Sequence, residues 1–321
     1  MDISIVIPTF KRQSSLERLL TSINLQDYPK DKFEVIVVDD HSGENLDPII
    51  RNYQKNLNVR WVISKVKGRP GARNTGVAEA IGRIIIFLDD DMEVEPSFFE
   101  AHEKSHNQGL CVVSGCIKAA AKYTGLWNTV IDSRFDLRDD KLNINRPQSF
   151  TSVFTGNMSV LKKTFNRMNG FDEVTFSYYG GEDFDFGIRC IQEGIPISYC
   201  ADAVALHHEK KWTKKTFCDY TRWAAYSMAI LVNKHRALLL HDPAMKGFPC
   251  RIPGIYEPKQ NSIKLAVKRI LQTGICYNAL FYSATLLWLV GNKKKAIDLV
   301  LLSRRMLYER VLQRAIEEKI A

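Results

Sequence analysis

Four short runs of β-branched and aromatic residues recur near the amino terminus, and segments of helical length separate them. Such a run is typical of a strand buried on both faces. Its regular alternation with helices predicts βαβ units around a mostly parallel sheet. Segments 14–24 and 72–81 place apolar residues along one face and are predicted as helices that pack on this sheet. The four runs span residues 3–7, 33–38, 59–63 and 84–88.

The later part of the chain has a different pattern. Further strands are predicted at 110–117 and 151–160, with a polar loop beside the site at 132–147. Beyond Lys210 we expect helices at 213–236, 262–273, 275–290 and 293–320. The sequence therefore predicts an α/β domain at 1–209, with halves at about 1–95 and 96–209, and a helical extension at 210–321.

Charge is divided unequally between these two parts. Residues 1–209 carry 24 Lys and Arg against 29 Asp and Glu, a net −5, whereas residues 210–321 carry 21 against seven, a net +14. A basic region of this size favours an anionic partner, either a membrane surface or a polyanionic substrate. Nucleic acid is not expected, because no helix-turn-helix, zinc-finger or RNP-type motif accompanies the charge.

The sequence also indicates the cellular compartment of the protein. The seven cysteines are scattered without a C-x-x-C pair, and the first residues resemble a strand more than a signal peptide. We therefore expect a cytoplasmic protein, with peripheral attachment to the inner face of the cell membrane as a further expectation from the basic region. Residues 270–292 carry no charge, but Gly274 and Asn278 interrupt them, which favours a packed or monotopic helix over a membrane span.

Three carboxylates, Asp89, Asp90 and Asp91, directly follow the fourth apolar run. Open α/β sheets bind ligands at the carboxyl ends of their strands. Like charges this close favour a cation, and oxygen ligands suit Mg2+ or Mn2+. The alternative is an acidic turn that caps the next helix, since Pro96 fits a first helical turn.

Three more motifs lie where a predicted strand ends or a predicted helix begins. The first run leads into a loop, 8–12, with hydroxyl, aromatic and basic groups that could grip a base and ribose. The second run ends in Asp39 and Asp40, which could accept hydrogen bonds from a nucleoside. The Gly-rich segment 68–76 begins a helix and carries cations near the expected position of phosphates.

Together these motifs resemble the amino-terminal half of family 2 glycosyltransferases, which use nucleotide sugars and have the GT-A fold. Segments 155–159, 170–173 and 180–189 are similar to the acceptor-side motifs of that family and follow in the expected order. The resemblance covers about residues 3–240. It implies a Rossmann-like, mostly parallel central sheet flanked by helices.

The resemblance also implies a donor site. Thr9, Arg12 and Asp40 would hold the nucleoside. Asp91, Asp89 and His207 would serve a divalent metal, Mn2+ or Mg2+, that offsets charge on the departing nucleoside diphosphate. As an alternative, Asp39 and Arg73 could pair with each other in the scaffold. The full donor set comprises Pro8, Thr9, Phe10, Arg12, Asp39, Asp40, Arg69, Asn74, Asp89 and Asp90.

Glu182 and Asp183 match the catalytic base motif of the family. Asp183 is expected to take the acceptor proton, whereas capping of the following helix is the alternative for one of the two. His207 fits the site better than His208, because adjacent residues of an extended chain point in opposite directions.

Segment 219–223 resembles the Gln-x-x-Arg-Trp motif of processive synthases but has Asp219 in place of Gln, so processive polymerisation is not expected.

The expected reaction is transfer of a hexosyl group from a nucleotide sugar, with a UDP-sugar favoured, to a hydroxyl of a glycan or lipid-linked acceptor. The resemblance implies inversion at the anomeric centre and a role in cell-surface glycan or glycolipid biosynthesis. A sugar nucleotidyltransferase is one alternative, although no G-x-G-x-R loop follows near Pro8. A non-catalytic membrane-binding scaffold that retains the fold is another.

Overall fold

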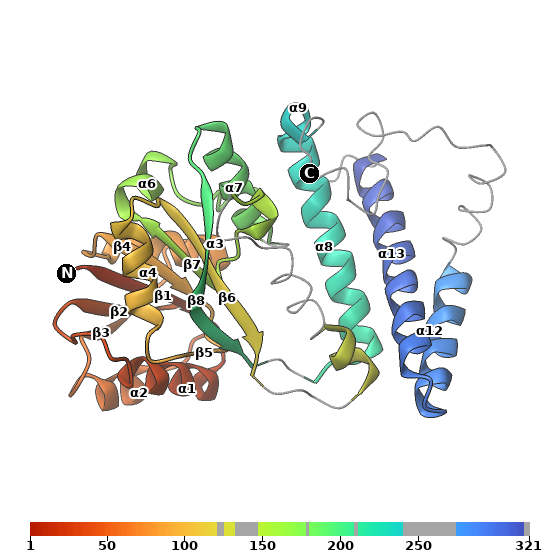
Figure 1. Ribbon diagram of the computed structural model, residues 1–321, viewed down its shortest axis with the longest axis horizontal. Coiled ribbons are helices and arrows are strands. Elements are labelled where there is room, and N and C mark those ends of the chain that lie inside the picture. The colour runs from red at the N-terminus through yellow and green to blue at the C-terminus, as the bar shows by residue number, and fades with distance from the viewer. Residues whose placement is uncertain (121–124, 132–146, 178–179, 209–210, 240–273, 318–321) are drawn as a thin grey trace. The chain divides into compact units, whose positions relative to one another are not determined.

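The computed structural model describes residues 1–120, 125–131, 147–177, 180–208, 211–239 and 274–317 (Figure 1). The chain divides into two compact units. The first consists of Met1–Ala121 and Phe135–Glu209, and the second of Lys122–Arg134 and Lys210–Ala321. The helix expected at 262–273 and nearly all of the loop expected at 132–147 lie outside the described residues.

The first unit is built around one eight-stranded sheet with the order β3-β2-β1-β4-β7-β6-β8-β5. Its strands are β1 (Ile3–Thr9), β2 (Phe33–Asp39), β3 (Val59–Ile63), β4 (Ile84–Leu88), β5 (Met92–Val94), β6 (Val112–Ala119), β7 (Asn157–Leu161) and β8 (Ile197–His207). Its helices are α1 (Gln13–Asn24), α2 (Asp47–Tyr53), α3 (Arg69–Glu79), α4 (Phe98–Asn107), α6 (Lys162–Arg167) and α7 (Glu182–Gln192).

The amino-terminal half of the sheet is parallel, as predicted. β1 pairs in parallel with both β2 and β4, and β2 pairs in parallel with β3. β7 is antiparallel to β4 and β6, and β8 is parallel to β6. The strand order therefore reverses between β1 and β4, and such a switch point opens a crevice beyond the carboxyl ends of the strands. The predicted α/β class with a carboxyl-terminal helical region is confirmed.

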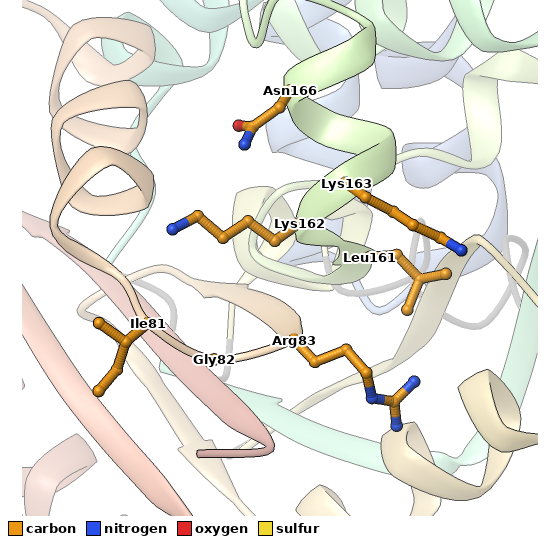
Figure 2. A pocket seen from close by; sticks show the side chains of 7 residues that line it. All are labelled: Ile81, Gly82, Arg83, Leu161, Lys162, Lys163 and Asn166. Atoms are coloured by element: carbon orange, nitrogen blue, oxygen red, sulfur yellow. The ribbon is translucent and has the colours of Figure 1, made fainter.

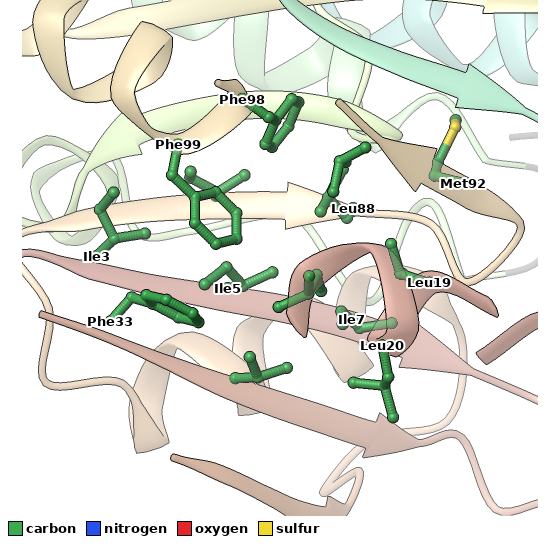
Figure 3. Packing of buried hydrophobic residues seen from close by; sticks show 14 of the residues in the cluster. Ile3, Ile5, Ile7, Leu19, Leu20, Phe33, Leu88, Met92, Phe98 and Phe99 are labelled. Carbon is green, nitrogen blue, oxygen red and sulfur yellow. The ribbon is translucent and has the colours of Figure 1, made fainter. Parts of the chain in front are cut away.

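Burial on both faces explains the continuous apolar runs. In β1, Ile3, Ile5 and Ile7 join a cluster that includes residues of α1, α2 and α4 (Figure 3). Val6 points to the opposite face and joins a cluster with residues of α3, α6 and α7. A strand covered by helices on both sides has no polar face, so it reads as uninterrupted hydrophobic sequence. One predicted strand, 151–160, began too early: the strand is Asn157–Leu161, and Phe150–Ser152 forms a 3-10 turn.

A buried polar network joins α4 to β7. His102 Nε2 lies 3.0 Å from Asn157 Oδ1, and Ser159 Oγ lies 2.8 Å from His102 Nδ1 and 2.7 Å from His106 Nε2. The Asn157 amide also donates to two backbone carbonyls and so fixes the start of β7. Burial lowers the pKa of His102 to about 3 and that of His106 to about 4, which keeps both rings neutral.

The second unit is helical. Its described helices include α8 (Lys214–Lys234), α9 (Arg236–Leu239), α12 (Gly274–Leu289) and α13 (Lys293–Glu317). Thr213 begins α8 with a capping box shared with Thr216. On α8, Arg222 pairs with Asp219 at 2.7 Å, and Trp223 is half exposed. Among the described helices, none has the length and apolar character needed to cross a membrane.

The two buried histidines predict acid lability of the first unit. Their folded pKa values lie below the ordinary value of 6.5, so the unfolded chain binds more protons as the pH falls. Stability present at neutral pH is then lost, by about 2 kcal/mol per histidine between pH 7 and pH 5. Urea unfolding of His102→Gln and His106→Gln should show a weaker pH dependence than the wild type.

The matched control is His41→Asn, at an exposed position with a positive φ that asparagine tolerates. It should keep the pH dependence of the wild type. If the free energy of unfolding of all three variants falls with decreasing pH as steeply as that of the wild type, the buried histidines do not cause the acid lability.

Candidate functional site

Side chains from the end of β1 and from the loops that follow β1 and β4 meet at the carboxyl edge of the sheet. Thr9 Oγ1 donates to Asp90 Oδ2 at 2.8 Å. Arg12 Nη1 donates to Asp90 Oδ1 at 3.0 Å and to Asp91 Oδ2 at 2.6 Å. The loop after β1 therefore partly neutralises the carboxylate triplet after β4. The contacts lie at the switch point between the two strands, where a ligand crevice is expected.

Asp90 and Asp91 respond differently to this environment. Burial raises the pKa of Asp90 to about 6, because desolvation outweighs the opposing charge of Arg12. Burial also disfavours ionisation of Asp91, but His207 and Arg12 outweigh it and lower the pKa of Asp91 to about 2. Asp91 is therefore the member of the pair that stays ionised throughout the neutral range.

His207 lies beside Asp91 because β8 pairs with β5, with His207 opposite Met92. His207 Nε2 is 3.3 Å from Asp91 Oδ1. His208 points away and pairs with Glu93 at 2.7 Å, while its backbone N–H donates to the Asp91 carbonyl at 2.9 Å. The two adjacent histidines thus point in opposite directions, with His207 on the side of the triplet.

The pair of Asp91 and His207 could provide two ligands for a divalent cation. Asp91 Oδ1 is buried and has no well-oriented hydrogen-bond partner in the described part of the chain. Across the same described residues, no preassembled group of three or more His, Cys, Asp or Glu side chains surrounds a metal position. Mg2+ and similar ions often bind one or two protein groups and complete their shell with substrate phosphates and water, so a two-residue arrangement fits a cation that arrives with a nucleotide.

Asp39 and Asp40 lie at the end of β2 and form different contacts. The Asp39 carboxylate accepts from the Ser42 backbone N–H at 3.1 and 3.2 Å, which closes the turn after the strand. Asp40 Oδ1 accepts from the Gly68 N–H at 2.7 Å, and burial raises the pKa of Asp40 although this N–H opposes the shift. Asp40 thereby ties the end of β2 to the start of α3.

Arg73 connects the two acid motifs, a role that the sequence did not predict. Its side chain is fully buried on α3. Nη2 donates to Asp89 Oδ1 at 2.7 Å, and Nη1 donates to Glu182 Oε1 at 2.5 Å. The alternative pairing of Arg73 with Asp39 does not occur. A guanidinium suits this position because its planar fork can serve two carboxylates at once.

Small residues allow α3 to approach the sheet closely enough to bury Arg73. A Cβ added at Gly76 would lie 2.3 Å from Val6 Cγ1, so only glycine permits this contact. Ala72, one residue before Arg73, is fully buried. The small residues of segment 68–76 were the sequence signal for a buried Arg73, because a helix that packs this tightly hides the residues next to its contact face.

Glu182 and Asp183 begin α7. Gly180 and Gly181 precede them with φ of 76° and 100°, a region that favours glycine. The N-cap position is Gly181, without a side-chain cap, so neither acid acts as the N-cap. Asp183 Oδ1 accepts from the Phe184 N–H at 2.8 Å. Burial, followed by the neighbouring charge of Glu182, raises the pKa of Asp183 to about 7.

Some of the remaining donor-site candidates are exposed, and others are buried or hydrogen-bonded within the protein. Phe10 and Arg69 are exposed at the ends of β1 and α3, whereas Pro8 is buried within β1. The Asn74 amide donates to the Phe171 carbonyl at 2.9 Å and to Glu173 Oε2 at 2.8 Å. Asn74 therefore holds the segment that precedes the acid motif.

A separate hollow lies at the opposite edge of the sheet. It has a volume of about 440 Å3 and is flanked by residues before β4 and after β7 (Figure 2). Figure 2 shows the amino groups of Lys162 and Lys163 pointing in opposite directions. Because these cations do not converge, we assign no ligand to the hollow. Its lining consists of Ile81, Gly82, Arg83, Leu161, Lys162, Lys163 and Asn166.

The chain is similar in sequence to known glycosyltransferases. Residues 4–168 match the family described as Glycosyl transferase family 2, and residues 140–210 match the N-terminal domain of galactosyltransferase. A hyaluronan synthase from Pasteurella multocida is 30% identical over 300 residues, covering 81% of this chain and 30% of that protein.

A second relative and a solved structure extend the comparison. The GalNAc(5)-diNAcBac-PP-undecaprenol beta-1,3-glucosyltransferase of Campylobacter jejuni is 29% identical over 184 residues, covering 56% of this chain and 57% of that protein. A mannosyltransferase from Pyrobaculum calidifontis, solved with GDP-Man and Mn2+, superposes with a TM-score of 0.63 at 17% identity. That alignment covers 99% of this chain and 88% of the other. The chain thus spans less than two thirds of either curated relative.

The Arg73 bridge predicts a large stability effect. Arg73→Met leaves Glu182 and Asp89 without their shared cation, and loss of one partner of a buried ion pair costs about 3–5 kcal/mol. Urea unfolding should show this loss. The double variant Arg73→Met, Glu182→Gln should recover part of it, because a neutral amide then replaces the buried Glu182 carboxylate while Asp89 stays unpaired.

Arg69→Met is the matched control, because Arg69 is exposed on the same helix. It should change the free energy of unfolding by no more than about 0.5 kcal/mol. Equal stability of the two single variants would show that the Arg73 bridge does not hold the two motifs together.

Proposed function

This chain belongs to glycosyltransferase family 2, and we propose that it transfers a hexosyl group from a nucleoside-diphosphate sugar to an acceptor hydroxyl. A UDP-sugar is the first donor candidate. The observation that carries the proposal is the Arg73 bridge, which joins the carboxylate triplet after β4 to the acid motif of α7. Donor-side and acceptor-side acids then belong to one site.

The nucleoside would bind at the end of β1 and β2. Exposed Phe10 offers a ring for contact with a base, and Asp40 offers a carboxylate oxygen to base or ribose. Thr9 and Arg12 act mainly by holding Asp90 and Asp91 in place. Arg69, exposed at the first residue of α3, is suited to the diphosphate.

A divalent cation would bind at Asp91 and His207, with Asp89 nearby. Such a cation supplies Lewis-acid stabilisation of the leaving diphosphate when it is bound. Support comes from Asp91 Oδ1, which is buried beside His207 Nε2 at 3.3 Å without a well-oriented hydrogen bond, and from the mannosyltransferase solved with Mn2+. Asp91 is the best ligand candidate, because its pKa of about 2 keeps it ionised.

Asp183 is the proposed general base. The acceptor oxygen attacks the anomeric carbon, its proton passes to the Asp183 carboxylate, and the bond to the nucleoside diphosphate breaks. A single displacement of this kind inverts the anomeric centre. Glu182 is committed to Arg73, so it acts as a neighbour that raises the pKa of Asp183 rather than as a second base.

The acceptor is proposed to be a glycan or a lipid-linked glycan in cell-surface polysaccharide or glycolipid synthesis. The Campylobacter relative is named for an undecaprenol-linked substrate, and the net +14 of residues 210–321 suits an anionic membrane surface. We accordingly place the enzyme in the cytoplasm, attached peripherally to the inner face of the membrane. A nucleotidyltransferase would instead release pyrophosphate, and a scaffold would release nothing.

A donor screen tests the proposed function. The full chain is incubated with UDP-, GDP-, ADP- and dTDP-sugars in Mn2+ or Mg2+, and release of nucleoside diphosphate is measured with and without mixed glycan acceptors. Metal-dependent release of one diphosphate is the expected result. Pyrophosphate release from nucleoside triphosphates, or absence of both release and metal-dependent nucleotide binding, would contradict it.

Two substitutions should separate donor binding from transfer. Asp91→Asn should abolish metal-dependent turnover, because it removes the ionised ligand. Asp183→Asn should lower transfer by roughly 100-fold or more but leave nucleotide affinity within about twofold, because only the base is lost. Glu193→Gln, at an exposed acid beyond α7, is the control. Near-normal transfer by either site variant would refute the role assigned to that residue.

The raised pKa of Asp183 predicts the pH dependence of the reaction. A base works when it is deprotonated, so kcat/KM should be low below the Asp183 pKa and rise with pH through about 7. Glu182→Gln should shift the midpoint to lower pH, since it removes a neighbouring negative charge. A pH profile that is flat from pH 5 to 8, or a midpoint that moves upward in Glu182→Gln, would contradict the assignment.

A further inference from the structure

Helix α12 has an unusual exposed face. Its sixteen residues, Gly274–Leu289, include no charged side chain. One face is buried in the second unit, where Phe281 and Ala284 pack with Phe217 and Val300. An ordinary surface helix would be polar on its other face, and a helix that is apolar all round normally has both faces covered.

The exposed face of α12 is an apolar stripe, which we define as Tyr282, Leu286, Leu289 and Val290. These residues are 69%, 63%, 76% and 69% exposed. Tyr282, Leu286 and Leu289 are spaced by four and three residues, which places them along one side of the helix, and Val290 directly follows the helix. Large apolar side chains gathered in this way mark an interaction surface more often than scattered single residues do.

Cations lie at both ends of the stripe. At one end, Lys214 Nζ lies 4.1 Å from the centroid of the Tyr282 ring. At the other end, Lys293, Lys294 and Lys295 follow Val290 after a short turn, and all three are exposed. No Asp or Glu occurs between residues 274 and 295. The described residues 211–239 and 274–317 carry 13 Lys and Arg against four Asp and Glu.

This charge pattern favours one of two candidate partners for the stripe, a second copy of the chain or an anionic surface. In a symmetric pair of chains, an antiparallel contact would bring Lys214 of one copy to the three lysines of the other, and a parallel contact would bring like ends together. Either arrangement opposes like charges. An anionic surface, in contrast, satisfies both ends at once.

We propose that the stripe docks on an anionic lipid bilayer, with α12 lying in the plane of the interface. The apolar side chains enter the boundary between headgroups and acyl chains, and Lys214 and Lys293, Lys294 and Lys295 contact the headgroups. At sixteen residues the helix is about 24 Å long, which suits a helix lying on the surface. The proposal locates the membrane attachment suggested above and rests on that part of the proposed function.

Vesicle flotation of the full chain tests the proposal. Wild-type protein should float with phosphatidylglycerol-containing vesicles, much less with phosphatidylcholine alone, and less again at high salt. Leu286→Ser, Leu289→Ser should reduce binding roughly tenfold or more, and so should the charge reversal Lys294→Glu, Lys295→Glu. Leu302→Ser, at a half-exposed leucine of α13, should bind within about twofold of wild type.

The outcomes separate this proposal from the enzymatic one. Equal binding to both vesicle types, or wild-type binding by both double variants, would overturn it. A change of sedimentation state in the leucine variant without a change in flotation would assign the stripe to a second copy of the chain. Nucleoside diphosphate release measured on a soluble acceptor reports the enzymatic proposal independently of either result.

Discussion

The arrangement of the site depends on one buried cation. Arg73 carries a single charge into a fully buried position, where it bonds to carboxylates that reach it from β4 and from α7. Desolvation of such a cluster is costly, and the ion pairs compensate only while both partners remain in place. Because of this constraint, the carboxyl edge of the sheet and the start of α7 are fixed relative to each other.

The contacts within the site also distinguish the acids that are bonded inside the protein from those that are proposed to act on the substrate. Asp89 and Glu182 are bound to Arg73, and Asp90 is held by Thr9 and Arg12, so these carboxylates organise the site. Asp91, which also accepts from Arg12, and Asp183 are the acids to which we assign the proposed chemistry. Their environments shift them in opposite directions, to pKa values of about 2 and about 7. These are the properties that the proposed metal ligand and the proposed general base require.

The convergence of the candidate site residues at one sheet edge was predictable from the sequence, whereas most of their bonding partners were not. Carboxyl ends of parallel strands share one edge of a sheet, so Thr9, Asp39 and Asp89 could be placed together from strand patterns alone. The bond from Arg73 to Glu182 joins residues 109 positions apart. Its prediction requires the packing distance of α3 on β1, which the glycines indicate but do not specify. The three-residue β5, which brings His207 to Asp91, is too short to leave a pattern, so only the family resemblance led us to expect these two residues together.

The central claim is that the carboxyl edge of the sheet binds a nucleotide together with a cation at Asp91. Its most direct test is anomalous diffraction at the manganese edge from crystals of the full chain grown with Mn2+ and a nucleoside diphosphate. The account predicts an anomalous peak within bonding distance of the Asp91 carboxylate, with the diphosphate beside it and the nucleoside at the ends of β1 and β2. A nucleotide bound away from this edge, or bound here with the manganese on other residues, would contradict it.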